Sequence, residues 1–164
     1  MATSTIVGSL HVTDTITAGG GVQVGSNSVT DSSVAAGAGI AASKLEHQYV
    51  ITEKQVGSAA DETRIMHIAQ GDGDIVGVKA ACIGVAVGSA TCTVDVKKNG
   101  TTILTGVITL NSSSVTLVAQ SGTLATTTYG DGDVFTVVFD GTTSGGTLPT
   151  GVAATLILRE DAAP

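Results

Sequence analysis

The stretch Asp74–Gly100, "DIVGVKAACIGVAVGSATCTVDVKKNG", decides the fold class of this chain. It contains two long runs of small and β-branched residues, and each run ends at a turn signal. The second signal, Asn99-Gly100, is the strongest two-residue hairpin signal, because a type I′ turn needs positive φ at both positions. Val, Ile and Thr also fit a pleated sheet better than a helix. The stretch therefore predicts antiparallel β-structure.

A register for this stretch follows if Gly88-Ser89 is also a hairpin turn. The register then predicts one core-facing set of six residues. These are Ile83, Val85 and Val87, placed opposite Val94, Cys92 and Ala90. Cys82 points away from Cys92 in this register, so no intrachain disulfide is expected. The opposite parity of the apolar residues just upstream predicts a β-bulge near Ala81-Cys82.

Apolar runs alternate with clusters of Gly, Ser, Asn and Asp from residue 49 to residue 159, which is typical of short strands. Hydrophobic residues make up 42% of the chain and aromatic residues only 2%, so Val, Ile, Leu and Ala must supply the core. We expect an all-β protein in which residues 47–164 form a β-sandwich or jelly roll of about eight antiparallel strands. The expected strands are "YVIT", "RIMHIA", "DIVGVKAACIGVAV", "ATCTVDVKK", "TTILTGVITL", "SVTLVA", "DVFTVVF" and "VAATLILR".

Residues 1–46 differ in charge and rhythm from the rest of the chain. All seven basic residues lie from Lys44 onward. Apolar residues recur every six positions in two series, Leu10, Ile16, Val22 and Val12, Ala18, Val24. A short repeat of this kind cannot bury its own apolar face, and ordering each residue costs about 1–2 kcal/mol. We expect an extended, β-rich N-terminal arm that is ordered against other copies or a partner, and that ends in a joint, "VAAGAGIAASKLE" (34–46). The alternative is an unstructured tail with accidental spacing.

Composition argues against several classes of function. The formal net charge is −7, and Lys97-Lys98 is the only adjacent basic pair, so the chain lacks the basic footprint of a nucleic-acid-binding protein. No window approaches the roughly 20 apolar residues of a membrane span, and the N-terminus lacks the basic start of a secretory signal. Two cysteines are too few for a disulfide framework or a four-ligand zinc site. We expect a soluble protein made in a reducing cytoplasm.

Catalytic and metal-binding patterns are also weak. "GDGD" occurs at 71–74 and at 130–133, but neither copy has the spacing of a calcium loop, so we expect turns that open the following strands. His11, His47 and His67 form no ligand pair, and His67 is expected on the outer face of a strand. There is no GxSxG elbow and no CxxC motif. We expect no enzyme activity, no cofactor and no metal.

A glycan-binding role needs exposed ring faces. Phe135 and Phe139 alternate with Val137 and are expected in the core, which leaves Tyr129 as the one credible surface platform.

Two segments of the arm carry a resemblance to a known family. "SVTDSSVAAGAGIAASKLEH" (28–47) resembles a segment that recurs in tailed-bacteriophage virion structural proteins, and "LHVTDTITAGGGVQVGSNSV" (10–29) resembles the repetitive β-segments of phage fibres and trimeric head attachments. The resemblance covers roughly residues 5–47. It implies a capsid decoration (cement) protein, a homotrimer that clamps the major capsid protein at the virion surface.

The sequence hypothesis is therefore a homotrimeric capsid decoration protein, made in the host cytoplasm, that binds and stabilises the shell. The alternative is a head- or tail-fibre component whose β-sandwich binds a host glycan, and a hydrolase is a distant third. Its partners are expected to be its own copies and the major capsid protein, with no nucleic acid and no membrane. The expected partner-binding residues are Leu10, Val12, Ile16, Val22, Val24, Val34, Ile40 and Leu45.

Overall fold

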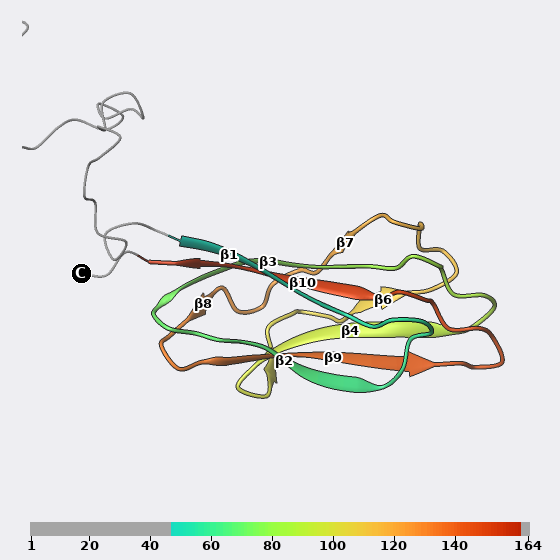
Figure 1. Cartoon of the computed structure of the whole chain (residues 1–164), viewed down its shortest axis with the longest axis horizontal. Helices are drawn as coiled ribbons and strands as arrows, with labels where there is room; N and C mark the ends of the chain where they lie inside the picture. The colour runs from blue at the N-terminus through green and yellow to red at the C-terminus, as the bar shows by residue number, and fades with distance from the viewer. Residues whose placement is uncertain (1–46, 162–164) are drawn as a thin grey trace, which may run out of the picture. The chain divides into compact units, whose positions relative to one another are not determined.

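A computed structural model describes residues 47–161 of the chain, and these residues form ten β-strands with no helix among them (Figure 1). The described part accordingly contains no helix long and apolar enough to cross a membrane. The strands are β1 (His47–Lys54), β2 (Glu62–Ile68), β3 (Gly73–Ala81), β4 (Thr91–Lys98), β5 (Thr101–Thr102), β6 (Ile108–Leu110), β7 (Gln120–Ser121), β8 (Thr128–Tyr129), β9 (Val134–Thr142) and β10 (Ala153–Glu160).

The strands form two antiparallel five-stranded sheets, which confirms the all-β sandwich. One sheet has the order β1-β10-β3-β7, with β8 also paired to β3. The other has the order β2-β9-β4-β5, with β6 also paired to β4. The pairing is nested, because β1 pairs with β10 and β2 pairs with β9. This nested pairing is the connectivity of a jelly roll. β5 with β6, and β7 with β8, each take the place of one strand, so the expectation of about eight strands is met.

The core lies between the two sheets and is built from aliphatic residues around two phenylalanines. Phe135, Val137 and Phe139 are buried on β9, as their alternation predicts. They face the alternate residues Ala154, Leu156 and Leu158 of β10, which are buried as well. The period of two that runs through both strands therefore places one apolar face of each sheet against the other.

The Asn99-Gly100 turn forms as predicted. Both residues have positive φ, 50° for Asn99 and 83° for Gly100. Lys98 pairs with Thr101 directly across the turn, so β4 and β5 make a two-residue hairpin. This turn type depends only on local backbone preference, and for that reason the dipeptide alone identifies it.

The predicted hairpin about Gly88-Ser89 is wrong. β3 and β4 lie in different sheets, and residues 82–90 cross from one sheet to the other. β4 pairs instead with β9, from Thr91 with Thr142 to Lys98 with Phe135. Of the six residues predicted to face the core, Ala90, Cys92 and Val94 are buried, whereas Ile83 and Val87 are 64% and 63% exposed.

The bulge does not lie near Ala81-Cys82, where it is predicted, and its true position changes the direction in which the Cys82 side chain points. On β3 the register with β10 shifts at Val76, between Ile75 and Gly77. The shift brings Val78 and Cys82 onto the same buried face as Ile75. Cys82 and Cys92 therefore both point into the core, yet both are free thiols. The absence of a disulfide was predicted, but from a register that the structure does not have.

The run "SVTLVA" (114–119) is not a strand. Val115, Leu117 and Val118 are exposed, and Leu117 has a φ of 61°. The segment is a loop before β7, held to the end of β3 because the Leu117 N–H donates to the Cys82 carbonyl (3.0 Å). The expected arm, its joint and the domain boundary at residue 46 lie outside the described residues.

Candidate interaction surface

The eight residues expected to bind partners all lie outside residues 47–161. They are Leu10, Val12, Ile16, Val22, Val24, Val34, Ile40 and Leu45. A candidate site within the described part of the chain must therefore come from the surface of the sandwich.

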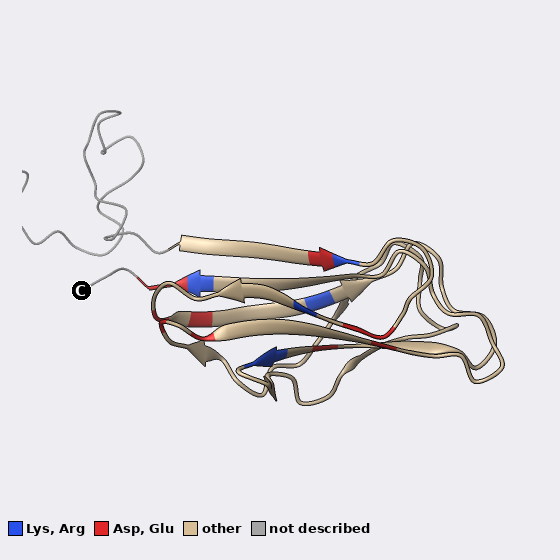
Figure 2. Ribbon diagram, turned by 60° about the horizontal axis from the view of Figure 1, so that its bottom comes forward, with Lys and Arg blue, Asp and Glu red and all other residues tan. Residues whose placement is uncertain are grey.

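The sheet of β1, β10 and β3 presents a face to solvent on which four of twelve side chains are charged, and we call it the outer face. Of its charged groups, Asp74 and Arg159 form an ion pair with each other. Figure 2 shows the positions of the charged residues along the strands. The side chains of the outer face alternate with the buried ones and are Gln48, Val50, Thr52 and Lys54 on β1, Ala153, Thr155, Ile157 and Arg159 on β10, and Asp74, Val76, Lys79 and Ala81 on β3.

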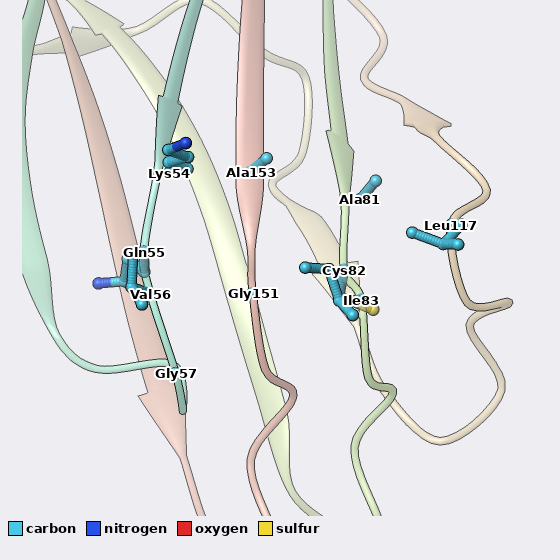
Figure 3. A pocket seen from close by; sticks show the side chains of 10 residues that line it. All are labelled: Lys54, Gln55, Val56, Gly57, Ala81, Cys82, Ile83, Leu117, Gly151 and Ala153. Carbon is cyan, nitrogen blue, oxygen red and sulfur yellow. The ribbon is translucent and has the colours of Figure 1, made fainter.

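One end of the outer face is hollowed and apolar (Figure 3). The hollow has a volume of about 330 Å³ and lies where β1 and β3 end and β10 begins. Three exposed side chains border it, Val56, Ile83 and Leu117, and we call them the end patch. Figure 3 shows Leu117 pointing from its loop toward the end of β3. Exposed apolar groups gathered in this way are typical of protein–protein contact sites.

Gln55 is the one buried polar side chain beside the hollow, and its amide is already used within the protein. Its Nε2 donates to the Ala60 carbonyl (2.8 Å) and to Glu62 (3.0 Å), and its Oε1 accepts from the Ala60 N–H (3.1 Å). The polar groups that fix a small ligand's orientation must be free to bind it. The hollow is therefore better suited to an apolar side chain of a partner than to a polar small molecule.

The face of the opposite sheet carries charged groups at a similar density. Its outward positions on β4 and β9 are Thr91, Thr93, Asp95 and Lys97, and Val134, Thr136, Val138, Asp140 and Thr142. Charge therefore does not distinguish the two faces. The exposed apolar side chains gathered around the hollow make the end patch of the outer face the stronger candidate for an interaction surface.

The two "GDGD" segments form turns that open strands, as expected, and they lie side by side. β3 begins at Gly73, and β9 begins directly after Asp133. The Asp131 N–H donates to Asp72 Oδ1 (3.0 Å) across the two segments. Within residues 47–161, no three His, Cys, Asp or Glu side chains are grouped closely enough to hold a metal ion.

Asp133 organises the second of these turns. Its carboxylate accepts from the Gly130 N–H (2.9 Å) and from Asn99 Nδ2 (2.6 Å), and it forms an ion pair with Lys98 (3.1 Å). The Gly130 N–H, with Lys98 and Asn99, holds the pKa of Asp133 below its usual value. The carboxylate therefore acts as a structural link between the turn and the β4–β5 hairpin.

Two expectations about aromatic and histidine side chains are wrong. Tyr129 is only 5% exposed, packs edge-on against Phe135 with ring centroids 5.7 Å apart, and provides no surface platform. Burial raises the pKa of its hydroxyl to about 12. His67 does not point outward, because its ring stacks on Phe135 (6.5 Å) and lies close to Tyr49 (5.8 Å). Sequence alternation alone cannot detect this inward turn, which accompanies a register shift between Ile65 and His67.

The cysteines are poor nucleophiles. Burial raises the pKa of the Cys92 thiol to about 11 and also raises that of Cys82. A reactive cysteine needs a lowered pKa and access to solvent, and these two have neither.

The chain matches no protein-family model, no curated protein and no solved structure at a significant level.

Proposed function

We propose that this chain is a structural protein of a virion, namely a homotrimeric capsid decoration protein that binds the major capsid protein and stabilises the shell. The observation that carries the proposal is the jelly-roll connectivity, a fold used by viral capsid and lectin domains. Fold alone does not define function, so a decoration protein also needs a surface that can bind the shell.

The outer face and its end patch supply that surface. The end patch lies around one hollow and is strongly exposed, by 91% at Val56, 64% at Ile83 and 74% at Leu117. Leaving three large apolar side chains in water is unfavourable in free energy. Burying each of them against a partner is favourable by about 1.5–3 kcal/mol. Many copies on one shell would add such contacts through avidity.

The fibre alternative relied on Tyr129 as a ring platform for a host glycan. That ring is buried. We therefore do not propose glycan binding as a second function.

Electron cryomicroscopy of phage particles prepared with and without the gene for this chain tests the proposal. We expect additional density on the shell at three-fold positions in the complete particles only, and a trimer mass for the purified protein in sedimentation. Full-length protein that leaves capsids bare but binds host cells would favour the fibre alternative.

The role of the end patch is tested by a matched pair of substitutions. Ile83→Ser removes an apolar group of the patch, and Ile65→Ser removes one from β2, in the other sheet, where the side chain is equally exposed (63% against 64%). We expect Ile83→Ser to weaken capsid binding about tenfold or more, the factor that corresponds to 1.4 kcal/mol, with Ile65→Ser close to wild type. Equal binding by both variants would exclude the end patch as the contact.

A further inference from the structure

The edge of β1 is open to pairing. β1 has one neighbour within the described part of the chain, β10, and it is aligned with that strand over eight residues without a shift, from His47 with Glu160 to Lys54 with Ala153. Its other side presents backbone donors and acceptors.

The hydrogen bonds around β1 identify which residues face the open side. The Gln55 N–H donates to the Val152 carbonyl (2.8 Å), so the odd-numbered residues of β1 are the ones bonded to β10. The Lys54 carbonyl instead accepts from Arg64 Nη1 (2.9 Å), away from β10, as this alternation requires. Arg64 covers that end of the edge. Along the rest of the β1 edge, Val50 and Thr52 therefore direct their backbone N–H and C=O groups away from β10, toward the open side.

The other sheet edges are blunted. β7 and β8 have two residues each, β5 has two and β6 has three, too few to act as pairing templates. β2 is longer, but its register shifts between Ile65 and His67, and it carries Glu62 and Arg64. Shortness, bulges and charges are the usual ways in which proteins protect sheet edges. β1 has neither proline nor bulge, and its only charged residues are Glu53 and Lys54 at one end.

The chain itself contains a segment suited to this edge. Residues 10–18, "LHVTDTITA", include five β-branched residues and neither glycine nor proline, and apolar residues occupy positions 10, 12, 16 and 18 on one face of an extended strand. Residues 19–46 connect this segment to β1. At about 3.3 Å for each residue they reach up to about 90 Å, enough to span a sandwich and arrive at a neighbouring copy.

We propose that residues 10–18 of one copy add as a strand to the β1 edge of a neighbouring copy, where they pair with Val50 and Thr52. This inference rests on the homotrimer of the proposed function. In a ring each copy donates one segment and receives one, so the contact closes on itself. Main-chain hydrogen bonds supply the affinity, as in other cases of strand addition, and the outer face gains a further row of apolar side chains beside Val50.

Amide hydrogen exchange of the full-length protein in solution tests the pairing. The N–H groups of Val50 and Thr52 are expected to exchange slowly, like that of Ile51, which β10 protects. Consecutive N–H groups of a strand point to opposite edges, so Thr13→Pro with Asp14→Pro removes a donor from whichever edge pairs with β1. We expect this variant to speed exchange at Val50 and Thr52 about tenfold or more while Ile51 is unchanged. Ser26→Pro with Asn27→Pro, placed outside the segment, is the control and should leave all three amides unchanged.

Unchanged exchange at Val50 and Thr52 in the first variant would overturn the proposal. Because no capsid is present, this result is independent of capsid binding. A homotrimer that fails to bind shells would contradict the proposed function and leave the strand addition standing.

Disulfide trapping tests the exchange between copies. Asp14 lies on the same face of the segment as Val12 and Ile16, so its side chain is expected beside that of Thr52 on the outer face. A chain with Asp14→Cys is mixed with a longer, tagged chain with Thr52→Cys, and the two are refolded together and oxidised. We expect a mixed disulfide of intermediate size, and the pair Ser26→Cys with Thr52→Cys is expected to give at least tenfold less. If instead one chain that carries both Asp14→Cys and Thr52→Cys links only to itself, the exchange between copies is wrong.

Discussion

Gly73 shows how a single residue limits the sequence at the start of β3. A Cβ atom added there would lie 2.2 Å from the Arg159 carbonyl oxygen and 2.6 Å from the Tyr129 hydroxyl. Backbone cannot yield at such distances, so only glycine fits between β10 and the buried tyrosine. The "GDGD" motif is therefore a packing requirement at this position as well as a turn.

We predict that Gly73→Ala lowers the free energy of unfolding by about 1–3 kcal/mol or more, the usual cost of overpacking. Gly77→Ala is the matched control, because it lies on the same strand and an added Cβ there meets nothing within 4 Å. Its effect should be small or slightly stabilising, by about 0.4–1 kcal/mol. Urea denaturation of the two variants measures the difference, and equal losses would contradict the packing argument.

The buried thiol of Cys92 predicts how stability changes at alkaline pH. Its pKa is raised from 9.0 to about 11 by burial, so between these values the folded state holds a proton that the unfolded state releases. The free energy of unfolding should therefore fall as pH rises through this range, by up to about 1.4 kcal/mol for each pH unit. Below pH 9 the Cys92 thiol is protonated in both the folded and the unfolded state, so its ionisation should not affect the free energy of unfolding.

Cys92→Ala provides the comparison for that pH dependence. The variant loses core packing at every pH, but its decline between pH 9 and 11 should be shallower than that of the wild type. Tyr129 is unchanged in both proteins, so its own ionisation contributes equally. Identical slopes in thermal or urea denaturation would count against a buried, protonated Cys92.

At the scale of elements, Asp133 joins two turns that are distant in sequence. It links the turn before β9 to the β4–β5 hairpin through Asn99 and Lys98. The Val134 N–H adds a bond to Asn99 Oδ1 (2.8 Å), so the two turns hold each other in place. We predict that Asp133→Ala lowers the free energy of unfolding by about 1–3 kcal/mol, because it leaves the partly buried Gly130 N–H without its acceptor.

Asp131→Ala is the control for Asp133→Ala, since Asp131 lies in the same turn with an exposed side chain. Such surface changes usually remain within about 0.5 kcal/mol of the wild type. Chemical denaturation of both variants measures the contrast. If Asp131→Ala lowered the free energy of unfolding as much as Asp133→Ala, the stabilisation would come from the turn as a whole and not from the Asp133 carboxylate.

At the scale of the whole molecule, the two faces and the four edges of the sandwich are unequal. One face ends in an apolar hollow bordered by the exposed side chains of Val56, Ile83 and Leu117. Three edges are shortened, bulged or charged, and the edge of β1 is long and regular. This inequality is why the outer face is proposed for the capsid and the β1 edge for a neighbouring copy.

The local features of the fold follow from the sequence alone. Asn99-Gly100 predicts its own turn, because the need for positive φ at two adjacent residues is a property of the dipeptide. The alternation of Phe135, Val137 and Phe139 predicts their burial, because side chains of a strand alternate between its faces. Composition and the spacing of short strands likewise predict a sandwich.

Pairing between distant segments is what only the tertiary structure decides. Nothing near Gly88-Ser89 reveals that β4 pairs with β9, a strand far along the chain. The local pattern therefore predicts Ile83 in the core, whereas it borders an exposed hollow. Tyr129 is buried because β8 pairs with β3 and brings its ring against Phe135, a contact with no local signal. Local backbone preferences determine turns and strands, whereas the free energy of burying both sheets together selects their partners, and with them the surface.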